Sequence, residues 1–283
     1  MQTVNRLPDL RAAVDSLRQR GEVALVPTMG ALHDGHLTLV REARRKAPAV
    51  VVSIFVNPTQ FGPGEDLAAY PRQLADDARL LESESVDLLW APPVEEVYPA
   101  GFATTVSVGG LGDGLCGAAR PGHFDGVATV VAKLFAQVRP DIALFGEKDW
   151  QQLAVIRRMA RDLDLTRPHA ERIVGVPTAR EADGLAMSSR NRYLSPDDRN
   201  RAAALPRLMH EAIERIESGG AVAEALEALT RELVAAGFAS VDYAELAHAE
   251  DLQPLAALNG RPARLFVAAR IGGTRLIDNM PVG

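Results

Sequence analysis

Residues 23–56 hold the feature that most restricts the fold, which is two apolar runs separated by an amphipathic helix pattern. The runs 23–26 and 49–56 are rich in β-branched residues, and the second is apolar enough for a strand covered on both faces. The stretch 34–46 has apolar residues at helical spacing and stops before Pro48. A strand, a helix and a second strand form a β-α-β unit, which predicts a parallel sheet with a right-handed crossover.

The same patterns predict two regions that differ in how helices and strands follow one another. In the first, we expect helices over 7–20, 73–84, 127–138 and from Gly146 to about 162, and strands over 86–90, 104–108, 142–145 and 172–176. In the second, we expect helices over 197–218 and 222–236 and strands over 240–246, 265–270 and 274–279, the last two joined by the hairpin signal Gly272-Gly273. The chain is therefore predicted to be α/β, with a parallel-sheet domain over 1–179 and a smaller α+β domain with an antiparallel sheet over 180–283.

Composition excludes several classes of function. The 283 residues carry a formal net charge of −6, which gives no electrostatic footprint for nucleic acid or an anionic membrane. The single cysteine, Cys116, excludes a disulfide framework and a cysteine-rich metal site. Residues 1–15 lack the apolar core of a signal peptide, and no apolar run approaches the roughly 20 residues that span a bilayer. These features predict a cytoplasmic enzyme or binding protein.

The turn between the first strand and its helix, PTMGALHDGH at 27–36, predicts a nucleotide site. A helix start offers unpaired N–H groups and the positive end of the helix dipole, which suit a phosphate. Gly30 and Gly35 allow the backbone to approach a ligand closely. His33 and His36 share a face of the first helical turn, where both imidazoles could donate to a transferring phosphoryl group. An isolated His pair is commonly unremarkable, and a zinc site would need further ligands.

Two other turns offer groups for a second substrate and for phosphate. The loop 57–62 contains Gln60, whose amide suits a hydroxy acid or an amide, although a plain Asn-Pro turn explains the loop alone. After the strand at 142–145, Lys148 can reach a phosphate and Gln152 lies one helical turn later.

Three further segments each have a functional and an ordinary interpretation. Residues 188–190, Ser-Ser-Arg, could clamp a triphosphate or form a serine-rich turn. Asp76 and Asp77 could hold magnesium or lie on a solvated helix face. The glycine-rich stretch 109–126 is long enough for a mobile or functional loop, and its Arg120 could meet an anion or remain a surface charge.

Five segments in order resemble the motifs of the pantoate–β-alanine ligase (pantothenate synthetase) family over nearly the whole chain. They are PTMGALHDGH, FVNPTQFG, RPGHFDGV, LFGEKDWQQ and DGLAMSSRN. The resemblance of the first to the wider HxGH nucleotidyltransferase superfamily implies a Rossmann-like N-terminal domain, and family membership implies a homodimer. It also implies that ATP activates pantoate as pantoyl adenylate, releasing pyrophosphate, and that β-alanine then displaces AMP to give pantothenate.

The resemblance further implies roles for individual residues. His36, as proton donor, His33 and Lys148 would be catalytic, and Gln60 and Gln152 would bind pantoate, with Gln60 also near β-alanine. Asp76 and Asp77 would hold Mg²⁺. The expected ATP contacts are Met29, Gly30, Ala31, Leu32, His33, Asp34, Gly35, His36, Gly146, Glu147, Lys148, Asp149, Ala179, Met187, Ser188, Ser189 and Arg190.

Two other functions remain open at this point. One is an HxGH adenylyltransferase with a phosphorylated acceptor, although the neutral Gln60 and Gln152 argue against it because phosphate recognition calls for cationic side chains. The other is an inactive nucleotide-binding regulator, against which His36 and Lys148 both speak.

Overall fold

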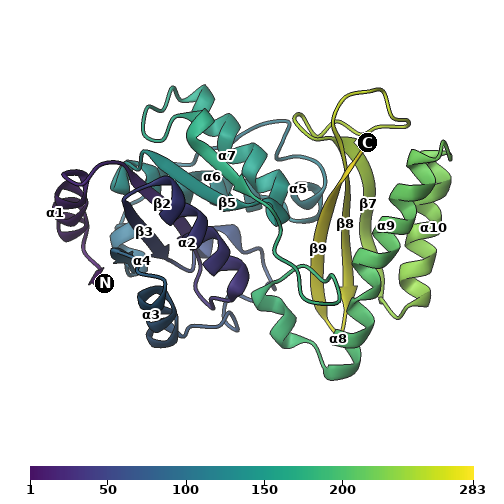
Figure 1. Ribbon diagram of the computed structural model, residues 1–283, viewed down its shortest axis with the longest axis horizontal. Coiled ribbons are helices and arrows are strands. Elements are labelled where there is room, and N and C mark those ends of the chain that lie inside the picture. The colour runs from purple at the N-terminus through teal and green to yellow at the C-terminus, as the bar shows by residue number, and fades with distance from the viewer. The chain divides into compact units, whose positions relative to one another are not determined.

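The computed structural model describes residues 1–283, which form two compact units (Figure 1). The first unit comprises Met1–Gly112, Arg120–Glu147 and Gln152–Pro177. The second unit comprises Asp113–Ala119, Lys148–Gln151 and Thr178–Gly283.

The first unit is built on a six-stranded sheet in which every pair of neighbours is parallel. In the order in which they pair, the strands are β1 (Gln2–Val4), β4 (Leu88–Trp90), β3 (Ala49–Ile54), β2 (Val23–Thr28), β5 (Ile142–Gly146) and β6 (Ile173–Val176). The chain runs from β2 outward through β3 and β4, then returns to the other side of β2 to form β5 and β6. The strand order therefore reverses between β2 and β5. In open parallel sheets, ligands bind outside the carboxyl ends of the strands at such a point.

The helices of this unit lie between its strands in the chain, and residues 49–53 of β3 are all buried, as the continuous apolar run predicts. The helices are α1 (Leu7–Arg18), α2 (Asp34–Lys46), α3 (Leu74–Ser83), α4 (Val94–Val97), α6 (His123–Val138) and α7 (Trp150–Asp162). On one face, α2 packs against β2, β3 and β5, and Val40 and Ala43 of α2 are fully buried there. Full burial of one such aliphatic side chain as large as valine contributes about 1.5–3 kcal/mol. No helix of the structure has the length and apolar character needed to cross a lipid bilayer.

The second unit contains the predicted antiparallel sheet. Its sheet is antiparallel, with β8 between β7 and β9, and the turn at Gly272-Gly273 has positive φ angles of 55° and 75°, as the hairpin signal predicts. The helix predicted over 197–218 is divided at Ala203. From residue 196 onward, the elements of the second unit are α8 (Pro196–Ala202), α9 (Ala204–Glu217), α10 (Val222–Ala235), β7 (Ser240–His248), β8 (Ala263–Ile271) and β9 (Thr274–Val282).

Two local predictions are wrong, and one strand was not predicted. Residues 104–108 form no strand, because the Val106 N–H donates to the Thr129 side chain of α6 rather than to a neighbouring strand. The helix expected from 127 begins at His123, directly after the left-handed Gly122 (φ 79°). The edge strand β1, which pairs with β4, was not expected from its three mainly polar residues.

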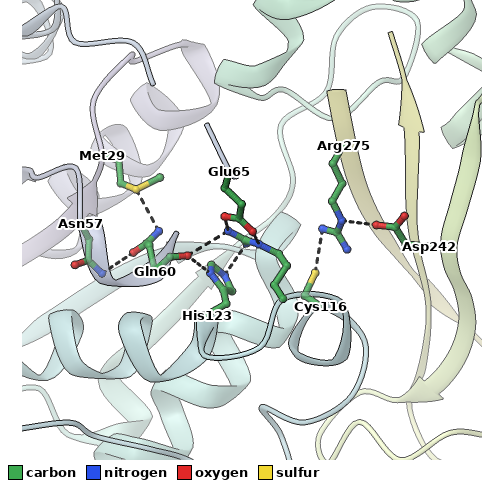
Figure 2. A network of polar contacts seen from close by, with 9 residues as sticks. Met29, Asn57, Gln60, Glu65, Cys116, His123, Asp242 and Arg275 are labelled. Carbon is green, nitrogen blue, oxygen red and sulfur yellow. Dashed lines mark hydrogen bonds and ion pairs between the residues drawn. The ribbon is translucent and has the colours of Figure 1, made fainter. Parts of the chain in front are cut away.

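A short helix, α5 (Cys116–Ala119), attaches the first separate piece of the second unit to its sheet (Figure 2). Cys116 Sγ lies 3.0 Å from the Tyr243 hydroxyl and 3.5 Å from Arg275 Nη1. Arg275 Nε in turn donates to Asp242 Oδ2 at 2.7 Å. Burial, together with the thiol of Cys116, raises the pKa of Tyr243, so its hydroxyl stays protonated. The glycine-rich stretch is thus partly fixed by side-chain contacts.

Candidate functional site

The turn after β2 places two imidazoles at the start of α2. His33 is the residue that caps this helix, in an extended conformation (φ −140°, ψ 174°). The His33 N–H donates to His36 Nδ1 at 3.4 Å, and the two ring centroids are 4.1 Å apart. Because Nδ1 of His36 accepts, the proton of the neutral ring is assigned to Nε2. His36 therefore has a donor for an anion at the helix start, where the helix dipole favours negative charge.

A carboxylate from α3 holds the backbone of this turn. Asp77 is only 1% exposed, and its Oδ2 and Oδ1 accept from the backbone N–H groups of Ala31 and Leu32, each at 2.9 Å. Gln73 Nε2 also donates to Oδ1, at 3.2 Å. The adjacent Asp76 is exposed and forms an ion pair with Arg79.

This arrangement does not fit a magnesium site shared by Asp76 and Asp77. The two carboxylates have separate partners, and both oxygens of Asp77 already bind N–H groups. The structure contains no group of three or more His, Cys, Asp or Glu side chains that could hold a metal ion. Magnesium prefers several oxygen ligands in octahedral geometry, and the carboxylates of Asp76 and Asp77, each with its own partners, do not form part of one such set.

The loop after β3 carries Gln60 in a single turn of 3₁₀ helix, Pro58–Gln60, with its amide group oriented (Figure 2). Asn57 Nδ2 donates to Gln60 Oε1 at 3.0 Å, and Gln60 Nε2 donates to Met29 Sδ at 3.2 Å. Asn57 is 1% exposed and accepts from the Tyr98 hydroxyl at 2.8 Å. Gln60 is therefore tied to Met29 of the turn after β2, which brings two of the predicted contacts together.

The backbone of Gln60 is held by a second group of residues, which the sequence did not predict for this role (Figure 2). His123 Nδ1 lies 2.8 Å from the Gln60 carbonyl oxygen and donates to it, because a carbonyl can only accept. Arg120 Nη2 donates to the same oxygen at 3.3 Å, and Nη1 donates to His123 Nε2 at 3.0 Å. Glu65 pairs with Arg120 through Nε at 2.7 Å and Nη2 at 2.6 Å. Hydrogen bonding to this guanidinium lowers the pKa of Glu65.

The signal for this group was present in the motif RPGHFDGV, in which Arg120 and His123 are three residues apart. The sequence favoured an anion contact or a surface charge for Arg120. Its guanidinium is instead mostly buried, with 16% of the side chain exposed, and paired with Glu65. Arg120 therefore acts here on the Gln60 loop.

The carboxyl ends of β2 and β5 meet at the same edge of the sheet, since the two strands pair in parallel. Gly146 and Glu147 follow β5 directly, and Gln152 lies half-buried on α7. Of the remaining predicted contacts near α2, Asp34 faces solvent and pairs with Arg41. Ala31 and Leu32 are buried in the turn, at 0% and 1% exposure.

Lys148 and Asp149 belong to the second unit. Lys148 Nζ lies 3.7 Å from Asp149 Oδ2, and the Lys148 carbonyl accepts from Asn279 Nδ2 of β9 at 2.8 Å. Close by in the chain, Trp150 Nε1 donates to the Ala249 carbonyl at 2.7 Å. The backbone around Lys148 is thus fixed by the antiparallel sheet of its own unit.

The other phosphate-contact candidates of the second unit lie on one folded loop. The Met187 N–H donates to the Ala179 carbonyl at 2.9 Å, and Ser188 Oγ accepts from the Arg190 N–H at 3.3 Å. Ser189 is buried, at 8% exposure. A fixed turn therefore joins Ala179 to residues 187–190, which brings these predicted contacts together within the unit.

The pantoate–β-alanine ligase sequence model matches residues 2–281 of the chain. The chain belongs to the pantoate–β-alanine ligase family. A pantothenate synthetase of Novosphingobium aromaticivorans is 68% identical, covering 100% of this chain and 99% of the relative. Another, from Sphingopyxis alaskensis, is 62% identical and covers 100% of both chains. The protein is accordingly an enzyme, a ligase of pantothenate biosynthesis.

Solved structures of pantothenate synthetases share the fold. A crystal structure of the enzyme from Thermus thermophilus has a TM-score of 0.90 and 54% sequence identity, covering 99% of each chain. A pantoate–β-alanine ligase from Francisella tularensis, described as complexed with β,γ-ATP and β-alanine, has a TM-score of 0.83 and 34% identity, covering 99% of this chain and 97% of that one. The predicted parallel-sheet and antiparallel-sheet architecture is therefore confirmed as that of the pantoate–β-alanine ligase family.

Proposed function

We propose that the enzyme makes pantothenate in two steps through pantoyl adenylate. A carboxylate oxygen of pantoate attacks the α-phosphorus of ATP, the bond from that phosphorus to the bridging oxygen breaks, and pyrophosphate leaves. The amine of β-alanine then attacks the activated carbonyl carbon and loses a proton, and AMP leaves. The observation that carries this proposal is the coupling of a phosphate-type helix start, with His33 and His36, to the oriented amide of Gln60 through Met29.

In the first step, the proposed work of the protein is to position groups and to stabilise charge. The Nε2–H of His36, held by the Nδ1 contact, donates to the phosphates together with His33. Lys148 follows the end of β5 and supplies a positive charge to the α-phosphoryl group as its charge develops. The remaining proposed ATP contacts are Met29, Gly30, Ala31, Leu32, Asp34, Gly35, Gly146, Glu147, Asp149, Ala179, Met187, Ser188, Ser189 and Arg190.

In the second half of the site, amide groups bind pantoate. Gln60 and Gln152 are neutral and can both donate and accept, which suits the hydroxyl groups and carboxylate of a hydroxy acid. Asn57 holds Oε1 of Gln60, so the orientation of the Gln60 amide is fixed before substrate arrives. β-Alanine is proposed to enter beside Gln60.

Three further features belong to the proposal. Mg²⁺ is proposed as a cofactor for which phosphate oxygens of ATP would supply ligands, since Asp76 and Asp77 do not fit a shared site. The family resemblance implies a homodimer. The cytoplasm is proposed as the location because the reaction consumes ATP.

Pyrophosphate release tests the two-step mechanism. With ATP, Mg²⁺ and pantoate but no β-alanine, we expect a burst of about one equivalent of pyrophosphate per active site. β-Alanine should then turn the accumulated adenylate into pantothenate. Release that begins only after β-alanine is added would overturn the separate adenylate step.

Lysine variants test the assigned charge. Lys148→Ala should slow the burst by about 100-fold or more, since one preorganised charge contact in a transition state is worth roughly 3 kcal/mol. Lys46→Ala is the matched control, because Lys46 pairs with Glu42 at the far end of α2. A burst at the wild-type rate in Lys148→Ala would remove this role from Lys148.

A further inference from the structure

The turn between β2 and α2 contains two successive residues with left-handed backbone. Gly30 has φ 82° and Ala31 has φ 52°. Glycine adopts this conformation readily, but alanine does so at a cost because its Cβ crowds the backbone. Such a conformation persists only where the surroundings impose it. Ala31 therefore needs a restraint that holds it in this conformation.

The carboxylate of Asp77 supplies that restraint from 46 residues away in sequence. Its two oxygens bind two successive backbone N–H groups, those of Ala31 and Leu32, each at 2.9 Å. Successive N–H groups that converge in this way form a natural binding place for an anion. Here the anion is an internal carboxylate, and its 1% exposure is tolerated because charge-assisted hydrogen bonds replace water.

The space around the carboxylate is closely filled. A Cβ at Gly30 would lie 3.0 Å from Asp77 Oδ2 and 3.1 Å from a methyl group of Ile54. Glycine at this position therefore permits both the backbone conformation and the approach of the carboxylate. Gln73 binds the same carboxylate from the preceding turn of its own segment.

The residues that Asp77 binds lie directly before the histidine pair in the chain. Leu32 is followed by His33, which caps α2, and the His33 N–H fixes the ring of His36. We infer that Asp77 is a positioning residue that sets the backbone from which His33 and His36 act, and is not a metal ligand. The inference rests on the proposed role of the two histidines in pantoate adenylation.

The first test compares Asp77→Asn with Asp76→Asn in the pyrophosphate assay. In Asp77→Asn, an NH₂ group faces a backbone N–H in place of one oxygen, so the turn shifts. We expect the adenylation rate to fall about 10- to 100-fold, as for a displaced catalytic group, while the KM for pantoate stays within about twofold. Neither variant should change the Mg²⁺ concentration that gives half-maximal rate. Glu82→Gln on the exposed side of α3 is the control for loss of a negative charge from that helix.

A metal role for the two carboxylates gives a different result. Both asparagine variants would then need more Mg²⁺, and saturating Mg²⁺ would restore the rate of Asp77→Asn. Either outcome would overturn the inference. Circular dichroism and the pantoate KM show whether Asp77→Asn is folded.

NMR tests the contact independently of activity. In ¹⁵N-labelled wild-type protein, the Ala31 and Leu32 amide protons should resonate far downfield because they donate to a carboxylate, and in Asp77→Asn at least one should move upfield. The histidine ring signals should move with them. Unchanged amide signals in Asp77→Asn would overturn the inference even if the enzyme adenylates pantoate. If the signals move in Asp77→Asn but the wild-type protein makes no adenylate, the positioning contact is supported and the proposed function is rejected.

Discussion

Asn57 Nδ2 donates to the backbone carbonyl of Gly126 at 3.1 Å and so fastens the loop after β3 to helix α6. The same amide group holds Oε1 of Gln60. One buried side chain thus fixes both the path of the loop and the direction of its functional amide. Since Asn57 is 1% exposed, loss of these bonds would leave buried polar groups without partners, at a cost of about 1–3 kcal/mol each.

Gly126 is predicted to be intolerant of even a methyl group. A Cβ there would lie 2.3 Å from the Thr59 carbonyl oxygen and 2.7 Å from Gln60 Cα, and neither backbone atom can move aside without shifting the loop. In an exposed helix, Gly→Ala stabilises by about 1 kcal/mol. We expect Gly126→Ala instead to destabilise by about 1–3 kcal/mol and to raise the KM for pantoate.

Urea denaturation and pantoate-dependent pyrophosphate release measure the two effects. Gly109→Ala is the control, because Gly109 is exposed and a Cβ there meets no atom within 4 Å. If Gly126→Ala were as stable as Gly109→Ala and kept the wild-type KM for pantoate, the close packing of α6 on the loop would contribute neither to stability nor to pantoate binding.

The ion pair of Glu65 and Arg120 predicts a particular pH dependence of stability. Hydrogen bonding to Arg120 lowers the pKa of Glu65 from its ordinary value of 4.5, so the folded state favours the ionised carboxyl. The pair therefore contributes fully above pH 4.5, and its contribution disappears as pH falls through the lowered pKa of the folded state. Because 16% of the Arg120 side chain and 25% of the Glu65 side chain are exposed, we expect a contribution of about 1 kcal/mol.

The measurement is the difference in unfolding free energy between wild type and Glu65→Gln at several pH values. It should be constant from pH 8 to 5.5 and should shrink only below about pH 4.5. A difference that grows as the solution is acidified would contradict the assigned direction. Glu95→Gln, at an exposed position on α4, should show no such change.

The elements that the sequence predicted best are those whose pattern is local. The apolar run at 49–54 is a covered strand and Gly272-Gly273 is a hairpin, because burial on both faces and positive φ each leave a direct mark on composition. β1 has three mainly polar residues and exists because it pairs with β4, which a local pattern cannot reveal.

The candidate site divides in the same way. The turn at 27–36 and its histidines follow from a strand–glycine–helix pattern. Asp76 and Asp77 are chemically identical neighbours, and only the fold distinguishes the one exposed to solvent from the one that binds the Ala31 and Leu32 amides. The contacts of His123 with the Gln60 loop span 63 residues and leave no periodic trace in the sequence.

In the second unit, Asp278 of β9 is predicted to hold the loop that carries residues 187–190. Its side chain is fully buried and accepts from Arg180 Nη1 at 2.7 Å and Nη2 at 3.0 Å. The backbone of Arg180 forms an isolated antiparallel β-bridge with Ala186 of this loop, and Arg180 Nη1 also donates to the Gly184 carbonyl at 3.0 Å. A buried bidentate pair thus ties the loop to the sheet.

Asp278→Ala should therefore cost about 3 kcal/mol of stability, the low end for breaking a buried pair, because Arg180 is 26% exposed and can reach water. It should also raise the KM for ATP more than the KM for pantoate, since residues 187–190 are proposed to contact phosphates. Asp183→Ala is the matched control, because the pair of Asp183 with Arg199 is more exposed and is worth less than about 1 kcal/mol. Thermal denaturation and steady-state kinetics of both variants decide the point. Equal losses of stability in the two variants would show that the buried pair of Asp278 stabilises the loop no more than the exposed pair of Asp183 does.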